Sequence, residues 1–357
     1  MIKVIHILFA TLLLLSCERR ELTYGYNTYD VLVNVDWSAL EQKQGEAPSG
    51  MSVIFYPQQG GKAIVTQTNK INKATIGLPA GRYDVLVFNQ IPSDFGTIGF
   101  RGMDKFETSE VFVKPTDGKW YESKGDGDIV ARQPEYLAVA TYLDFEINNE
   151  LVEASTRHND KNELFLTIDF EPEVFVKDMK AQVRIVGIHN LRAVRATVKG
   201  MSTGCHFATH ESCASMTIHL LETWEAAKYE GQDKEGEITA IFTSFGLPNH
   251  HAHTKSDDDW LGSFDFELLL VDNKTVVKET VYFSEKLITN KETRNSVALL
   301  SGEHDIDQTI KIGLSTDVDD KPIILPDVDP ELPPDGDGDW DVDLGDWGDE
   351  DIIEIPL

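Results

Sequence analysis

The sequence predicts an all-β protein made of two tandem antiparallel β-sandwich domains, followed by an acidic C-terminal tail. Short runs of alternating apolar and polar residues recur along the chain and are separated by Gly, Pro and Asn, a pattern typical of sandwiches. The length of 357 residues exceeds what one hydrophobic core usually spans, and 41% hydrophobic content can fill two cores. We therefore expect domains at residues 29–150 and 151–316 and a tail at residues 317–357.

The first 16 residues have the pattern of a secretory signal peptide. Lys3 precedes an apolar run from Val4 to Leu15, interrupted by His6 and Thr11, which is too short to span a bilayer. Leu14-Leu15-Ser16-Cys17 resembles a bacterial lipobox, which implies cleavage before Cys17 and its acylation. More than one acyl chain makes a membrane anchor effectively permanent. The alternative is an ordinary cleaved signal; in either case residues 17–28 form a linker.

Four strands are predicted in the first part of the N-terminal domain. Val31, Val33 and Val35 share one face of the first strand, and Leu32 and Asn34 lie on the other. A proline ends the second strand, and Ala80-Gly81 supplies a tight turn before the fourth strand. The four strands are residues 29–35, 51–57, 74–79 and 82–89. A further strand is expected at 106–113, and residues 134–143 have the character of a strand or a helix.

Longer strands are predicted beyond a polar segment at residues 148–162. Asp272-Asn273-Lys274 is expected to connect two well-patterned strands as a compact hairpin. The predicted strands are residues 163–171, 179–188, 193–198, 215–221, 236–245, 263–272, 275–284, 296–299 and 309–314. Together they indicate a second antiparallel sandwich.

Several of these segments resemble a known family. Val35-Asp36-Trp37-Ser38, Gly50-Met51 before Phe55-Tyr56-Pro57, and the run from Leu78 to Asn89 resemble Bacteroidetes lipoproteins of the DUF5119 type, allied to the fimbrillin and minor fimbrial subunit superfamily. The resemblance implies transthyretin-like or fimbrillin-like sandwiches and a lipid-anchored protein of the outer membrane, exposed at the cell surface. It also implies a fimbrial anchor or accessory subunit, or an adhesin. Its partners would be other fimbrial subunits, joined by β-strand addition, or surface ligands of host or bacterial cells.

Charge and motifs exclude other functions. The net charge is −29, and nucleic-acid binding relies on basic side chains, so nucleic acid is not an expected partner. No GxSxG, HExxH, Walker or GxGxxG motif occurs, and we expect no enzymatic activity. The alternative function is capture of a glycan or nutrient for an outer-membrane transporter, because Trp120, Trp260, Trp340 and Trp347 could stack on sugars.

Cys205 and Cys213 are the remaining cysteines. In an exported chain we expect them to form a disulfide that closes one surface loop. The alternative is a metal site that includes His206 and His210. Two other clusters are weaker metal candidates: Asp126 with Asp128, and His250, His251 and His253 with Asp257, Asp258 and Asp259.

The tail holds 16 acidic residues against one lysine, Lys321. Asp335, Asp337, Asp339 and Asp341 alternate as in the start of an EF-hand loop, although Trp340 occupies the position of the turn glycine. They could hold a structural calcium ion, and otherwise the tail is a solvated linker kept extended by prolines. No other cofactor is expected. The final apolar segment, with Ile352, Ile353 and Ile355, could add as a strand to an exposed sheet edge.

Overall fold

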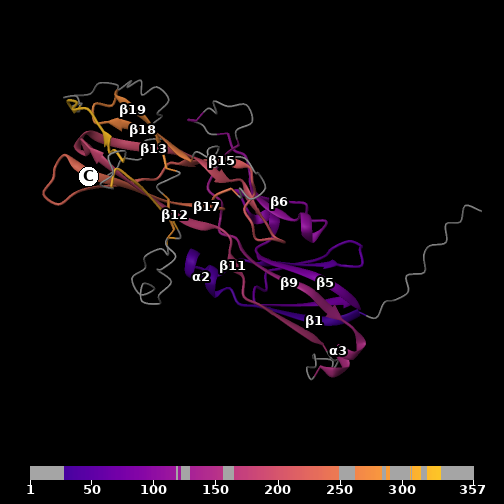
Figure 1. Ribbon diagram of the computed structural model, residues 1–357. Helices are drawn as coiled ribbons and strands as arrows, with labels where there is room; N and C mark the ends of the chain where they lie inside the picture. Colours follow the sequence, from indigo (N-terminus) through magenta and orange to yellow (C-terminus); the bar gives the residue numbers. More distant parts are fainter. Residues whose placement is uncertain are drawn as a thin grey trace, which may run out of the picture.

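The computed structural model describes residues 28–330 except 118–119, 122–128, 156–164, 249–261, 284–286, 290–305, 307 and 315–319. The described strands form five sheets, arranged along an elongated body (Figure 1). The predicted all-β fold is confirmed. The two short α-helices of the described part are α2 (Ser38–Gln44) and α3 (Asn149–Ala154). The sequence analysis did not predict α2, whose single buried residue is Leu40.

A sandwich of two sheets forms one end of the body. One sheet has the order β10-β1-β4 and the other β11-β9-β5-β2-β3. Their strands are β1 (Thr28–Val35), β2 (Met51–Pro57), β3 (Ile64–Thr68), β4 (Lys73–Pro79), β5 (Gly81–Asn89), β9 (Ala138–Ile147), β10 (Leu166–Phe170) and β11 (Glu173–Val174). Both β10 and β11 lie beyond residue 150, the predicted end of the N-terminal domain, yet they pair with β1 and β9.

The core of this sandwich follows the predicted alternation. Val31, Val33 and Val35 are buried and pack with apolar residues of β2 and β5 from the facing sheet. Ala80 carries the chain from β4 in one sheet to β5 in the other, so the expected turn is a crossing between layers. The Tyr83 ring is buried, and its hydroxyl donates to the Pro79 carbonyl at 2.9 Å. Burial raises the pKa of Tyr83.

A third, small sheet covers the opposite face of β2 and β5. Its order is β14-β7-β6, and its core includes Tyr56, Phe88 and Phe207. The strands are β6 (Ile98–Arg101), β7 (Glu110–Val113) and β14 (Gly204–His206); the adjacent turns are η1 (Pro92–Asp94) and η2 (Phe106–Thr108). Because both faces of β2 are covered, six consecutive residues from Met51 to Tyr56 are buried rather than alternating.

Two further sheets form the other end of the body, with the orders β16-β17-β12-β21-β20 and β19-β18-β13-β15-β8. They enclose the second large core. Their strands are β8 (Val130–Ala131), β12 (Lys177–Val186), β13 (Leu191–Ser202), β15 (Met216–Leu221), β16 (Glu225–Lys228), β17 (Glu235–Ser244), β18 (Ser263–Leu270), β19 (Val276–Tyr282), β20 (Leu287–Thr289) and β21 (Gln308–Ile312); η3 (Ile188–Asn190) links β12 to β13. The predicted hairpin between β18 and β19 is confirmed.

Parallel pairing accompanies the expected antiparallel pairing. β1 with β10, β12 with β21, and β15 with β8 are parallel pairs of strands that are far apart in sequence. A fourth parallel pair joins β12 to β22 (Ile323–Ile324), which lies in the predicted tail. Ile323 and Leu325 are buried in the second core. This part of the tail is therefore packed on the sandwich, whereas the sequence analysis expected a solvated linker from residue 317 onward.

Candidate functional site

Several predicted site residues lie outside the described residues. They are Cys17, the acidic group Asp335, Asp337, Asp339 and Asp341, the terminal Ile352, Ile353 and Ile355, Asp126 and Asp128, and the cluster from His250 to Asp259. Lipidation, calcium binding and strand donation by these residues stay predictions. In the part of the chain that the structure describes, no helix is long and apolar enough to cross a membrane.

The two remaining cysteines lie on a short hairpin. β14 runs toward a turn at residues 207–210, and the chain returns past Ser212, which bridges to Cys205. The Cys213 amide donates to the Gly204 carbonyl at 2.8 Å. Successive side chains in a strand point to opposite faces. Cys205, which pairs with Ser212, therefore points into the core beneath the small sheet. Cys213 and His206 point to the opposite face.

The structure records both cysteines as free, buried thiols, so the expected disulfide is not formed in it. The opposite facing of the two side chains is the physical reason, since a disulfide needs both Cβ vectors to converge. Burial raises the pKa of Cys205 to about 12. Burial, followed by the charge of Glu110, raises the pKa of Cys213 to about 11.

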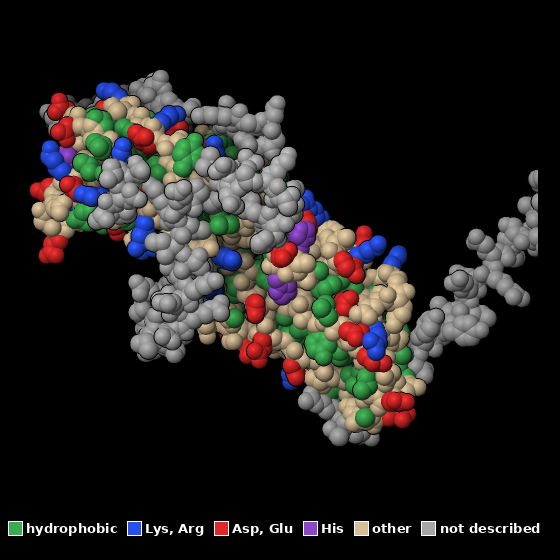
Figure 2. Space-filling view, viewed as in Figure 1, with side chains coloured by type: hydrophobic (Ala, Val, Ile, Leu, Met, Phe, Trp, Pro, Cys, Tyr) green, Lys and Arg blue, Asp and Glu red, His purple; other side chains and the backbone are tan. Residues whose placement is uncertain are grey.

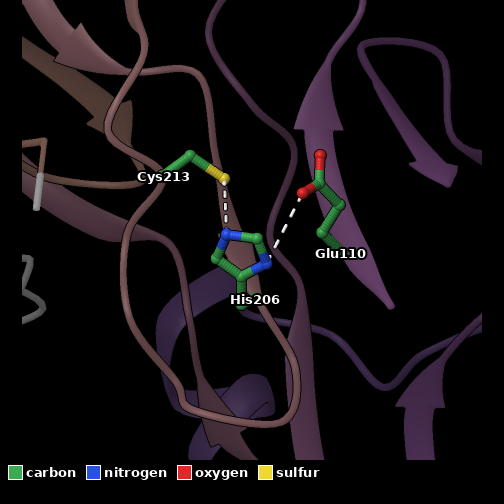
Figure 3. A group of neighbouring side chains, drawn as sticks. All are labelled: Glu110, His206 and Cys213. Carbon is green, nitrogen blue, oxygen red and sulfur yellow. Dashed lines mark hydrogen bonds and ion pairs between the residues drawn. The ribbon is translucent and has the colours of Figure 1, made fainter. Parts of the chain in front are cut away.

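Cys213 instead joins a cluster with Glu110 and His206 (Figure 3). Glu110 on β7 lies directly opposite His206 on β14, so the two side chains share one face of the sheet. Nδ1 of His206 is 3.5 Å from Oε2 of Glu110, and Nε2 is 3.8 Å from Sγ of Cys213. The imidazole thus lies between the carboxylate and the thiol.

The other oxygen of Glu110 is held by Arg101. Its Nε pairs with Oε1 of Glu110, and its guanidinium lies 4.9 Å from the centre of the Phe112 ring. Arg101 is the β6 partner of Glu110 in the register. A row of three side chains, Arg101, Glu110 and His206, therefore crosses the small sheet, and the carboxylate is oriented from both sides.

The order Cys, His, Glu is also the order of a thiol nucleophile, its base and an orienting carboxylate. A reactive thiolate requires a lowered pKa in an electropositive setting. The pKa of Cys213 is shifted upward, so the cluster does not have the electrostatics of that chemistry. Its donor atoms, all within 4.8 Å of one another, are instead of the types that bind transition metals.

The sequence analysis found part of this cluster. It associated Cys205, Cys213, His206 and His210 as an alternative metal site but did not include Glu110, which comes from a strand far earlier in the chain. The ring of His210 lies 4.9 Å from that of Phe175, and its Nε2 is 3.3 Å from Oγ1 of Thr141. His210 and Cys205 are therefore not members of the cluster.

An ion pair joins the two ends of the body near this sheet. Nζ of Lys43 on α2 lies 2.8 Å from Oδ2 of Asp178 on β12, and the Tyr136 hydroxyl donates to Oδ1 of the same carboxylate. Asp178 is fully buried. The pair favours the arrangement in which α2 lies beside β12. Separating the two elements would leave the buried Asp178 carboxylate without a compensating charge.

Trp120 was a candidate for stacking on sugars. The Arg195 guanidinium lies 4.6 Å from the ring centre, and the indole N–H donates to Glu222 at 2.9 Å. One face of the ring is therefore already covered by a cation. Figure 2 shows acidic and basic side chains interspersed over the visible face, without a continuous basic patch.

Unpaired sheet edges are the other candidate surfaces. β11 pairs only with Val139 and Ala138 of β9, so residues 140–147 have no second strand partner among the described strands. This edge bears Tyr142 and Leu143, which are 47% and 59% exposed. β3, at the other side of the same sheet, carries the exposed Val65 among polar residues.

Comparisons with known proteins agree with this architecture. The chain has a multi-sheet β-sandwich fold. It is similar to the crystal structure of a protein from Bacteroides ovatus that is described as a "putative adhesin", with a TM-score of 0.55 and 21% identity. The match covers 89% of this chain and 98% of that one. Residues 16–222 match the family model "Domain of unknown function (DUF5119)", and the chain belongs to this family. The resemblance found in the sequence is thereby confirmed.

A curated protein of Bacteroides ovatus is similar over its whole length. It is 24% identical over 361 residues, which cover 98% of this chain and 97% of the relative. Its name is "Putative fimbrium anchoring subunit Fim4B".

Proposed function

We propose that the protein is a structural subunit of a fimbrium, retained in the outer membrane by acyl chains on Cys17 and working as an anchor or accessory subunit. The observation that carries this proposal is the end-to-end similarity to a relative named as a fimbrium anchoring subunit. The lipobox and the two large β cores support it. In this function the chain performs no catalysis: the lipid holds one end while packed sheets bear load.

Assembly would use backbone pairing at a sheet edge. A free edge presents unsatisfied N–H and C=O groups that a strand from a neighbouring subunit can pair with. The edge of β9 beyond residue 139 is the favoured acceptor, because the exposed Tyr142 and Leu143 would be covered by an added strand. The partner in this proposal is another fimbrial subunit.

The anchoring role is tested with Cys17→Ala in cells that assemble fimbriae, with Cys205→Ser as the matched cysteine control. We expect a fatty-acid probe to label the wild type and the control but not Cys17→Ala. Fibres should appear in the medium only with Cys17→Ala. Labelling of Cys17→Ala, or fibres that stay on those cells, would contradict the proposal.

The assembly edge is tested with Leu143→Asp, and Val65→Asp serves as the control because both side chains are exposed on edge strands. A charge at Leu143 should reduce recovery of this chain in purified fimbriae, because the added strand would cover it. The control should be recovered normally. Equal recovery of both variants would exclude β9 as the acceptor.

A further inference from the structure

Three potential metal ligands lie together on the outer face of the small sheet. Strand pairing brings Glu110 opposite His206, and the return of the hairpin brings Cys213 beside them. Their ligand atoms are within 4.8 Å of one another, and Cys213 and Glu110 are buried while His206 is 40% exposed at its side chain. The backbone register, rather than a mobile loop tip, therefore fixes the spacing of two of the three donors.

We propose that Glu110, His206 and Cys213 bind a divalent transition-metal ion with the preferences of zinc. Carboxylate, imidazole and thiolate are all zinc ligands, whereas calcium and magnesium take oxygen ligands and leave a thiolate unused. The ion would displace the proton of the Cys213 thiol into solvent, and the resulting thiolate and the Glu110 carboxylate would balance its charge. Three protein ligands leave a fourth position, which would face the solvent beside His206.

Binding requires one local movement. The two nitrogens of His206 now face different partners, Nδ1 toward Glu110 and Nε2 toward Cys213, and one ion can bond to only one of them. One ligand atom of each residue already lies within 4.8 Å of the other two, so a small reorientation of the ring would place a single nitrogen with the carboxylate and the thiolate around the ion. The partial exposure of His206 allows this rotation without repacking of the core.

Arg101 supports the site as an orienting residue. It holds Oε1 of Glu110, which leaves Oε2 directed toward His206 for the ion. Outer partners of this kind fix the direction of a ligating carboxylate. Arg101 itself contributes no ligand atom to the metal.

A metal here would join parts of the chain that are distant in sequence. Glu110 belongs to a strand of the first part of the chain, and His206 and Cys213 follow β13 of the second large core. The ion would therefore stabilise the junction by linking β7 to the hairpin, since binding energy that is available only in the folded state adds to stability. This inference does not depend on the fimbrial role.

The test uses the full mature chain with Cys17 replaced by Ala, so that Cys205 and Cys213 are its only thiols, titrated with Co²⁺ and with Zn²⁺. Co²⁺ bound to a thiolate gives a sulfur-to-metal charge-transfer absorption that oxygen ligands of the acidic tail cannot produce. We expect one equivalent of Co²⁺ to generate this absorption, and Zn²⁺ to displace it and raise the Tm.

Cys213→Ser should abolish the charge-transfer absorption, while Cys205→Ser, which changes the thiol on the opposite face, should retain it. Glu110→Gln and His206→Gln should weaken Co²⁺ binding by roughly tenfold or more. His210→Gln should bind as the wild type does. Because Glu110→Gln and His206→Gln change less buried groups than Cys213→Ser does, they report on the site even if Cys213→Ser folds poorly.

The proposal is overturned if no thiolate absorption appears, if Cys205→Ser removes it, or if Glu110→Gln and His206→Gln bind as tightly as the wild type. In those cases the cluster is only a hydrogen-bonded group of side chains.

Discussion

His219 on β15 is fully buried, and its ring faces the second core on the same side as Val198, its partner in the register. Neither ring nitrogen makes a hydrogen bond of good geometry. Burial lowers the pKa of His219 to about 4, and the backbone of Arg132 and Ala131 opposes the shift only in part. The folded protein therefore holds this imidazole in its neutral form.

Stability should fall as the pH drops from 7 to 5 because of His219. The unfolded chain takes up a proton below the ordinary pKa of 6.5, whereas the folded chain does so only near 4. The lost free energy of unfolding is about 2 kcal/mol over this range. In His219→Leu, denaturant unfolding at several pH values should show a flatter dependence.

His210→Gln is the control, because His210 is exposed, and it should retain the wild-type pH dependence. An unchanged slope in His219→Leu would show that other groups cause the acid sensitivity.

Individual core residues could be predicted where the chain alternates, but the cluster of Glu110, His206 and Cys213 could be predicted only in part. Val31, Val33 and Val35 are separated by two positions, so their shared face follows from strand geometry alone. Glu110 meets His206 only because β7 pairs with β14, and no local pattern specifies that register. For the same reason, the facing of Cys205 and Cys213 required knowledge of the hairpin.

At the scale of elements, the short strand β22 attaches part of the acidic tail to the second sandwich by pairing with β12. The Leu325 amide donates to the Val186 carbonyl at 2.8 Å, and the Asp327 carboxylate accepts from Asn190. The hydrogen bond from Asn190 and the charge of Lys234 lower the pKa of Asp327. Composition predicted an acidic linker here, because the short apolar run from Ile323 to Leu325 lies in a segment rich in Asp and Pro.

A substitution at Gly187 tests whether β22 is held against β12. Its φ is +86°, and a Cβ there would lie 2.5 Å from the Leu325 carbonyl oxygen. Gly187→Ala should therefore both strain the backbone and displace β22. Gly45→Ala is the matched control, because Gly45 has a φ of +79° with nothing within 4 Å of the added Cβ.

We expect Gly45→Ala to cost about 1–2 kcal/mol of stability from backbone strain alone. Gly187→Ala should cost more and should release the tail faster under thermolysin, which cuts beside accessible Ile and Leu. Equal cleavage rates in the two variants would mean that β22 is not held by this contact.

At the scale of the whole molecule, strands from distant parts of the chain complete one another's sheets. β10 and β11 pair with strands of the N-terminal half, and β8 pairs with β15 of the second half. Hydrophobic periodicity predicted nearly every described long strand. It could not predict these partners, because a run of alternating residues carries no information about which strand lies beside it.

Two fragments test whether the first sandwich needs β10 and β11 for its stability. Residues 29–150 lack β10 and β11, whereas residues 29–176 include them. Loss of the buried Ile168 and Phe170 should lower the stability of the shorter fragment by about 3–6 kcal/mol. Thermal unfolding followed by circular dichroism should give a clearly lower Tm for residues 29–150. The same Tm for both fragments would show that β10 adds nothing to the first core.

The late pairing of β12 has a consequence for biogenesis. When the chain is made from its N-terminus to its C-terminus, β12 is available long before β21 and β22, which complete one of its edges. Until the C-terminal part of the polypeptide is available, β12 is left with one open edge and is prone to aggregation. The second sandwich therefore cannot complete its β12 sheet until the C-terminal strands are present.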